Sequence, residues 1–554
     1  MKRKVYALLM ATLMLCMSAC GSQTSESVES SATTVVESSV TSGESKETEA
    51  SVSEGAVESK EEGKEQEQQK ESVKMIAAMK SSETFRDWDS VTYDETAYVE
   101  YDKIYLTEEA AKEYPALAAT LKSMASLTDD QYAAIYEDLL ADVEAIKEDF
   151  DGDTSMFLPV YDTTELSIAR SDDRAFTIAS SYTSYSGGVH GYYAMSGINI
   201  DSATGKELTF KDVFKNTAVL PELVASALEE EYDTVFFVDV REYLMENITS
   251  EYTDLCWLLD YEGVTFFFNP YEIASYAEGL LSAKITFEEH PEIFNPYYME
   301  SPESYIVGGT QDYLALDYSD YDGDGSKEMI FISPGELNDW DCYDGFNVDF
   351  DGKVTFIPGE SYYYDFYLMR VKDGKSILMV QNHLESDYAY LDVYSLSSKG
   401  VKKVDTFSGY FGYIAIDPDE YEYAKILPTD PSHLRLSVRT DLLSTLDATT
   451  TMKLEKDGTL TKLDNEYHYN TTITLTAKQS ISGKGVDEAG NENGKTVKVN
   501  AGDVLHFYST DRDNYVTFKV NGELVRFYVN YEYWPMTIDG IDAEELFEGM
   551  MFAG

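Results

Sequence analysis

Two kinds of hydrophobic spacing alternate along residues 76–300. Alternating apolar and polar positions predict strands in ETAYVEYDKIYL and in RAFTIASSYTSYSGGVHGYYAMSGINID, and spacings of three or four residues predict helices between them. Thr107 is a predicted helix N-cap, and Thr128 with Gln131 predicts a capping box that begins a second helix. We therefore expect an α+β domain over residues 76–300, built around an antiparallel sheet.

Short strands dominate the remainder of the chain. Residues 301–467 contain strand-like segments such as EMIFIS, SILMVQN and LRLSVRT, separated by turns that contain Asp-Gly. Three weak units of about 50 residues resemble propeller blades. Three blades do not usually close, so we expect a partial or merged propeller-blade-like region. Residues 468–554 form a predicted meander of short strands that resembles a bacterial SH3-like β-barrel.

The N-terminus has the parts of a secretion signal. A basic head precedes the apolar run VYALLMATLMLCM, which is too short for a membrane-spanning helix with its own stop signal. MSAC then places small residues before Cys20 and resembles the lipobox of bacterial lipoproteins. The resemblance implies removal of a signal peptide, residues 1–19, and a lipid on Cys20 that anchors the protein outside the cell membrane. An ordinary secretory signal is the alternative.

Residues 20–75 are rich in Ser, Glu, Thr, Gln and Lys and contain no aromatic residue. Such a segment buries too little apolar surface to offset the entropy of ordering it. We therefore expect a disordered tether, which suits a Gram-positive envelope where a domain stands off the membrane within a thick wall.

The formal net charge of the chain is -60. This sign argues against nucleic acid and anionic lipid as partners and favours cationic ones, although solubility alone also explains it. Cys256 and Cys342 lie in different predicted domains and in no CxxC motif. We therefore expect neither a zinc knuckle nor a redox pair; two free thiols are favoured, and one disulfide stays open.

Three sequence blocks, in order, carry a family resemblance. They are a Gly-Gly-x-His signature at residues 187–190, TGKELTFKDVF at 204–214 and NPYEIASYAEG at 269–279. Together they resemble the extracytoplasmic domain of unknown function shared by lysozyme-sensing anti-sigma factors and PdaC-type peptidoglycan deacetylases, over residues of about 84–295. The resemblance implies a module that faces a ligand. Its candidate ligand-binding residues here are Gly188, His190, Tyr192 and Tyr193.

The outputs of those families do not carry over to this chain. It has no membrane span with a cytoplasmic sigma-binding segment, no HxxxH pair and no TFDD-like acidic strand end. No GxSxG or other nucleophile motif accompanies His190. We therefore expect His190 to have a structural or ligand-contact role, with catalysis as the weaker alternative, and we predict no catalytic residues.

The segment DYDGDGSKE, residues 320–328, is the sharpest chemical motif. It places oxygen donors at alternating positions of a Gly-rich loop, which suits the six to eight oxygen ligands of calcium. Phe331 replaces the bidentate glutamate of an EF-hand, and the flanking strands instead resemble the calcium loops of FG-GAP propeller repeats. An acidic turn without an ion is the alternative. The predicted calcium ligands are Asp320, Asp322, Asp324, Ser326 and Glu328.

These observations predict a non-enzymatic cell-surface lipoprotein. Its partner would be an envelope ligand such as a cell-wall polymer, or a cationic protein such as lysozyme, and calcium would be a structural cofactor. A peptidoglycan-modifying or deacetylase-related enzyme with an unrecognised site is one alternative. A carbohydrate-binding surface protein that uses the β-rich half is the other.

Overall fold

The computed structural model describes residues 73–89, 94–149, 158–249, 255–310, 314–372, 375–385, 388–417, 422–532 and 534–553. The predicted signal peptide, Cys20 and nearly all of the predicted tether lie outside these residues. Among the described residues, no helix combines the length and apolar character that a membrane crossing requires.

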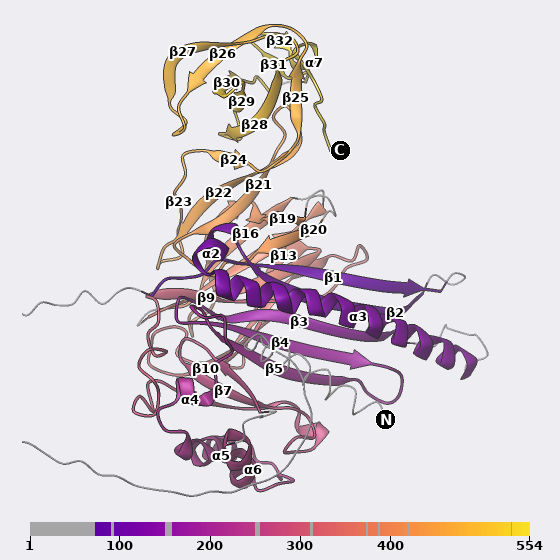
Figure 1. Ribbon diagram of the computed structural model, residues 1–554, viewed down its shortest axis with the longest axis vertical. Coiled ribbons are helices and arrows are strands. Elements are labelled where there is room, and N and C mark those ends of the chain that lie inside the picture. The colour runs from indigo at the N-terminus through magenta and orange to yellow at the C-terminus, as the bar shows by residue number, and fades with distance from the viewer. Residues whose placement is uncertain are drawn as a thin grey trace, which may run out of the picture. The chain divides into compact units, whose positions relative to one another are not determined.

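A seven-stranded sheet organises the first part of the chain (Figure 1). Its strand order is β19(Tyr413–Asp417), β20(Glu422–Ile426), β1(Ala78–Trp88), β2(Glu95–Leu106), β3(Val160–Ser171), β4(Ala175–Tyr185) and β5(Tyr192–Asp201). The expected antiparallel sheet is wrong in one pairing, because β2 and β3 run parallel. Two helices separate these strands, and such a crossover returns the chain to the same end of the sheet, so the next strand enters in the same direction. The region is α+β, and its sheet is mixed.

The helices of this crossover are α2(Glu108–Glu113) and α3(Pro115–Asp149). The predicted N-cap is confirmed, since the Thr107 hydroxyl accepts a hydrogen bond from the Ala110 backbone at 3.4 Å. The predicted helix start at Thr128 is wrong: α3 continues through it, and its hydroxyl donates to the Met124 carbonyl at 2.9 Å. A threonine can satisfy its hydroxyl inside a helix in this way, so it need not cap one.

Helix α3 lies across one face of the seven-stranded sheet (Figure 1). Tyr132, Leu139 and Val143 of the helix are buried against Val99 and Tyr101 of β2. The helical spacing of these apolar positions and their alternation along β2 therefore meet in one core.

A second layer follows β5. It consists of α4(Phe210–Val213), α5(Leu220–Glu231), α6(Val240–Thr249) and a three-stranded sheet of β6(Cys256–Leu259), β7(Gly263–Phe268) and β8(Leu281–Thr286). Buried Asn199 joins this layer to β5, because its amide donates to the Trp257 carbonyl at 2.9 Å and accepts from the Leu259 backbone at 2.8 Å. A Cβ on Gly197 would lie 2.1 Å from the Trp257 carbonyl oxygen, so the close approach of these two strands requires glycine.

Two sheets build most of residues 304–408. One contains β10(Leu314–Ser319), β11(Glu328–Pro334), β12(Tyr343–Phe350) and β13(Lys353–Ser361). The other runs in the order β17(Lys402–Ser408), β16(Ala389–Ser395), β15(Ile377–His383), β14(Tyr363–Val371) and β9(Ser304–Thr310). They share a core in which Ile330 and Phe346 of the first sheet meet Phe366 and Leu378 of the second. Strands β19 and β20 leave this region to pair with β1, so one sheet crosses the boundary expected at residue 300.

A twelve-stranded sheet contains most of the remaining strands, among them β21(Leu434–Thr440), β22(Leu446–Leu454), β24(Tyr467–Tyr469) and β28(Val504–Thr510). Strand β24 pairs with both β22 and β28, so this sheet also crosses an expected boundary, the one at residues 467 and 468. Among the strands that the structure describes, no closed barrel or propeller is defined. The chain is mostly β, and the SH3-like and blade-like interpretations stay predictions.

Candidate functional site

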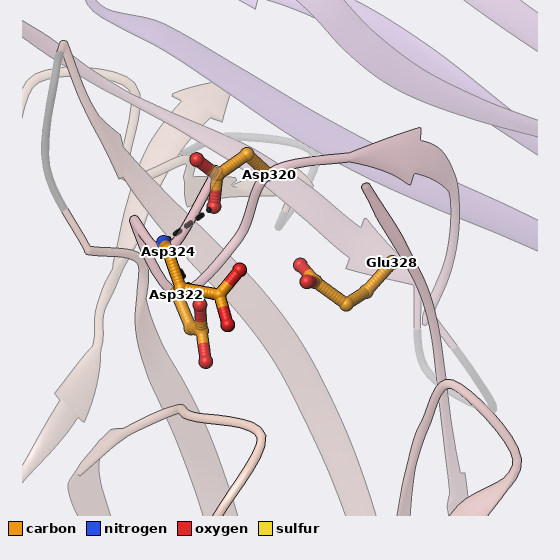
Figure 2. A group of neighbouring side chains, drawn as sticks. All are labelled: Asp320, Asp322, Asp324 and Glu328. Atoms are coloured by element: carbon orange, nitrogen blue, oxygen red, sulfur yellow. Dashed lines mark hydrogen bonds between the residues drawn. The ribbon is translucent and has the colours of Figure 1, made fainter. Parts of the chain in front are cut away.

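The acidic loop, defined as residues 320–328, joins β10 to β11 and brings four predicted ligands together. One carboxylate oxygen each from Asp320, Asp322, Asp324 and Glu328 lies within 4.8 Å of the others. Figure 2 shows the side chain of Glu328 reaching toward the three aspartates. Asp322 and Glu328 are buried and Asp324 is exposed, so the group has both an enclosed and an open side.

Backbone N–H groups hold these carboxylates in place. Asp320 accepts from the backbones of Gly323 at 2.7 Å and Asp324 at 3.2 Å, and Glu328 accepts from Tyr321 at 3.1 Å. Gly323 has a φ of 76°, which a residue without a Cβ adopts freely and which lets the loop fold back on the carboxylates. The spacing of the acidic residues therefore predicts the site and also allows the backbone hydrogen bonds that fold the loop.

Two further elements brace the acidic loop. The Asp322 carboxylate accepts from the Ser398 backbone at 2.7 Å, in the connection between β16 and β17. Arg370 of β14 donates to the Asp320 carbonyl at 2.9 Å and to Glu262 at 2.8 Å. Burial alone would raise the pKa of Glu262, but the charges of Lys284 and Arg370 lower it to about 2.

All five residues stay predicted ligands, and Ser326 is the one that would contribute its backbone carbonyl. Its backbone N–H donates to the Asp324 carboxylate at 2.9 Å, and nothing places its carbonyl among the four carboxylates.

Negative charge accumulates in the acidic loop. Burial, together with the charges of Asp322, Asp320 and Asp324, raises the pKa of Glu328. None of the four carboxylates forms a salt bridge with a described residue. The neighbouring Lys327 instead contacts Glu289, 3.1 Å away. Four neighbouring carboxylates that form no salt bridge with a described residue suit a divalent cation that prefers oxygen ligands.

The second candidate site lies at the hairpin between β4 and β5. Gly187 and Gly188 have φ values of 82° and 112°, so the glycines of the signature provide the reversal that a side chain would hinder. The exposed ring of His190 stacks on Tyr276, with 4.1 Å between ring centroids. Its Nδ1–H donates to the Gly191 carbonyl at 2.8 Å. This hydrogen bond orients the ring through Nδ1, and the role of His190 stays a prediction.

Two tyrosines that sequence reasoning missed complete this site. The Tyr276 hydroxyl donates to the Gly191 carbonyl at 2.9 Å, and its ring lies 5.7 Å from Tyr193 and 5.5 Å from Tyr271. We define the aromatic surface as His190, Tyr193, Tyr271 and Tyr276. Both missed tyrosines belong to NPYEIASYAEG, one of the blocks that carry the resemblance, so the block itself is the signal that could have located them.

The block is fixed to β5 through Asn269. Its side-chain amide accepts from the Met195 backbone at 2.7 Å and donates to the Met195 carbonyl at 3.1 Å. Tyr271 holds a φ of 70°, in a left-handed region that bulky residues rarely adopt, and its ring is 54% exposed. Backbone strain of this kind concentrates at functional sites.

The other two predicted ligand-binding residues, Gly188 and Tyr192, contribute no side chain to the aromatic surface as we define it. Tyr192 is adjacent to Tyr193 on a strand, so the two side chains point to opposite faces, and Tyr192 contacts Tyr182. Gly188 contributes its carbonyl, which accepts from Tyr185 at 3.0 Å. Sequence reasoning therefore found two members of the aromatic surface, His190 and Tyr193.

Both cysteines of the described chain are free. Cys256 is buried in β6, and burial raises the pKa of its thiol to about 12. The expectation of two free buried thiols is confirmed for Cys256; Cys342 is free as well, but it is only half-buried.

Comparison with known proteins places one family inside this region. Residues 211–288 match DUF3298, described as a protein of unknown function. This match lies within the residues expected to form the ligand-facing module. No curated protein matches the chain.

Two solved structures are similar to part of the chain. A DUF3298 family member from Bacteroides fragilis NCTC 9343 is 19% identical, with a TM-score of 0.32, over 41% of this chain and 98% of that one. A DUF3298 family protein from Pseudomonas aeruginosa PAO1 is 16% identical, with a TM-score of 0.27, over 41% of this chain and 97% of that one.

Proposed function

We propose that this chain is a non-enzymatic, extracytoplasmic lipoprotein that binds a cationic protein such as lysozyme through the aromatic surface. The observation that carries the proposal is the convergence of His190, Tyr193, Tyr271 and Tyr276 beside the Gly-Gly hairpin. Aromatic side chains of this kind supply large contact areas at protein interfaces, and tyrosine adds a polar group that can hydrogen-bond a partner.

The charge of the chain supports a cationic partner. A formal net charge of -60 draws basic proteins toward the surface and raises their association rate, and this contribution weakens as salt increases. The aromatic contacts bury apolar area and depend less on salt. The two contributions can therefore be separated by ionic strength. A cell-wall polymer, which offers no such positive charge, is the competing ligand for the same surface.

The direct experiment titrates lysozyme against residues 21–554 at physiological salt. We expect micromolar or tighter binding that weakens at least tenfold, about 1.4 kcal/mol, in His190→Ala and Tyr276→Ala. Tyr423→Ala is the matched control, because this tyrosine is 52% exposed on β20 and lies outside the aromatic surface.

Two results would contradict the lysozyme proposal. One is binding that appears only at low salt; the other is equal binding of an unrelated basic protein such as cytochrome c. Binding to purified peptidoglycan is measured in parallel with the same variants. If the substitutions weaken binding to peptidoglycan but not binding to lysozyme, the polymer is the ligand.

We also propose that the acidic loop binds calcium as a structural cation. Its support is the set of four neighbouring carboxylates without a salt bridge among the described residues. Extracellular calcium sites have dissociation constants of about 10⁻⁴–10⁻³ M. Calcium at about 10 mM should then stabilise the folded chain by about 1–3 kcal/mol. Calorimetry of chelator-treated protein should record a calcium-dependent rise in melting temperature that Asp324→Asn diminishes; no rise in the unmodified chain would exclude the site.

Anchoring through Cys20 is the remaining part of the proposal. It rests on the MSAC sequence at the end of the apolar run. Cys20→Ala should move the protein out of the membrane fraction, and retention there would mean that the lipobox interpretation is wrong.

A further inference from the structure

A pocket of about 350 Å³ opens between the two sheets of residues 304–408. Phe346 of β12 and the end of β13, residues 358–360, line one side, and the facing strands β15, β16 and β17 line the other. Natural ligand pockets measure about 300–1,000 Å³, so this volume suits a small molecule. The pocket, which we name the intersheet pocket, is lined by residues of neither the acidic loop nor the aromatic surface.

Strand register brings the polar side chains of this pocket together. Tyr390, Asp392 and Tyr394 occupy alternate positions of β16 and share one face. Asn382 of β15 pairs with Tyr390, and Thr406 of β17 pairs with Asp392, so both lie on that same face. On this face, Tyr394 is buried in the core between the sheets, and the remaining side chains are polar.

Asp392 is the centre of a hydrogen-bond network. One carboxylate oxygen accepts from Thr406 at 2.8 Å and lies 2.7 Å from the Lys403 ammonium. The other accepts from the Tyr394 hydroxyl and the Asn382 amide, each at 3.3 Å. Asp392 is only 9% exposed, so these donors and the charge of Lys403 compensate its burial. The charges of Asp392 and Lys403 balance each other, and Glu360 on the facing side adds one carboxylate to the lining, which opposes anionic ligands.

Several groups stay available to a ligand. The Asn382 amide nitrogen donates within the protein, whereas its amide oxygen accepts no hydrogen bond from any described residue. Lys403 has three N–H donors, of which the contact with Asp392 uses one. The Thr406 hydroxyl donates to Asp392 and still has acceptor lone pairs that the network does not use. The ring of Tyr390 is 37% exposed and stacks on no described aromatic residue.

An exposed tyrosine ring beside mixed donors and acceptors fits a molecule with one apolar face and several hydroxyls. A sugar ring has this character, since its C–H groups pack on the negative face of an aromatic ring while its hydroxyls both donate and accept. A charged ligand would compete with the Lys403–Asp392 pair, and the chain's charge of -60 opposes anions. We propose that the intersheet pocket binds a short neutral saccharide.

The test measures binding of residues 21–554 to N-acetylglucosamine, glucose and their disaccharides by titration calorimetry and saturation-transfer NMR. Cationic glucosamine and anionic glucuronate are the charge controls. We expect saturable binding of a neutral sugar, stronger than that of both charged sugars. Tyr390→Ala should weaken it at least tenfold, whereas Tyr390→Phe, which keeps the ring, should preserve it.

Tyr423→Ala again serves as the matched control, and thermal melting verifies that each variant is folded. The proposal is overturned if no neutral sugar binds saturably, if a charged analogue binds more tightly, or if Tyr390→Ala binds as the unmodified chain does. Because none of these residues belongs to the aromatic surface, the lysozyme titration is independent of the result.

Discussion

Replacing Lys425 by Met should destabilise the protein strongly, because this lysine compensates a buried carboxylate. Asp365 of β14 is 3% exposed, and one of its oxygens contacts both the Lys425 ammonium and, at 3.1 Å, the Nε2 atom of His383. Lys425 belongs to β20 of the seven-stranded sheet, so the contact joins that sheet to the five-stranded one. Lys80, the other lysine nearby, lies 2.9 Å from Asp102 and is engaged there.

The magnitude follows from burial. Burial alone would raise the pKa of Asp365, but Lys425 and His383 lower it to about 2. Burial lowers the pKa of His383, so in the unmodified chain the ammonium of Lys425 is the main charge that compensates Asp365 at neutral pH. Removing one partner of a buried ion pair costs about 3–5 kcal/mol. Residues 73–554 form one compact unit. An unfolding entropy of about 2 cal/mol/K per residue then means that each kcal/mol lowers its melting temperature by about 1 °C, so the expected decrease is about 3–5 °C.

The assay is thermal and urea unfolding at pH 7, with Lys453→Met as the matched control. Lys453 also lies on a strand and contacts Glu455 at 2.7 Å, but the two side chains are 43% and 36% exposed. Its removal should therefore cost less than about 1 kcal/mol. The double variant Asp365→Asn with Lys425→Met should be more stable than Lys425→Met alone, since it leaves no buried charge unpaired. Equal stabilities of the Lys425→Met and Lys453→Met variants would refute the reasoning.

Three further predictions concern single side chains. Because burial lowers the pKa of His383, the unfolded chain takes up a proton near pH 6.5 and the folded chain does not; stability should fall as the pH decreases below 6.5, and His383→Gln should flatten that part of the unfolding profile. A thiol reagent should modify half-exposed Cys342 faster than buried Cys256 in the folded protein, and similar rates would show that β6 opens readily. Gly197→Ala should destabilise the protein by about 1–3 kcal/mol, measured by urea unfolding, because its Cβ would overlap the Trp257 carbonyl; an unchanged midpoint would mean that the two strands separate at little cost.

Local signals predicted local structure. Thr107 caps a helix because its hydroxyl accepts from the N–H of Ala110, one of the free N–H groups in the first turn. Residues 107–110 contain the whole interaction. The signal at Thr128 is of the same kind and includes Gln131 as a capping-box partner, yet there the chain continues as a helix whose apolar side packs on β2. The contacts that continue this helix are made with the sheet. Residues 128–131 alone could therefore not show whether a helix begins at Thr128 or continues through it.

For a related reason, the sequence did not predict which strands share a sheet. Met79 pairs with Ile426 and Lys80 with Lys425, and several hundred residues separate the partners. Alternation shows that each segment is a strand, but it does not specify which of many strands it pairs with. The boundaries expected at residues 300 and 467 from the pattern of strands and helices therefore separate segments whose strands enter one sheet.

The candidate sites differ in the same way: one is built from neighbouring residues, and the others from residues far apart in the sequence. The four carboxylates of the acidic loop lie within nine consecutive residues, so their spacing alone predicts that they meet. His190 and Tyr276 meet only because Asn269 fixes a distant segment to β5. In the intersheet pocket, Asp392 has Thr406 beside it through the pairing of β16 with β17, and a register shift of one residue would turn either side chain to the opposite face. The buried apolar positions of these strands hold that register. The apolar core between the sheets therefore determines which polar side chains line the intersheet pocket, although only the edge of that core lines the pocket itself.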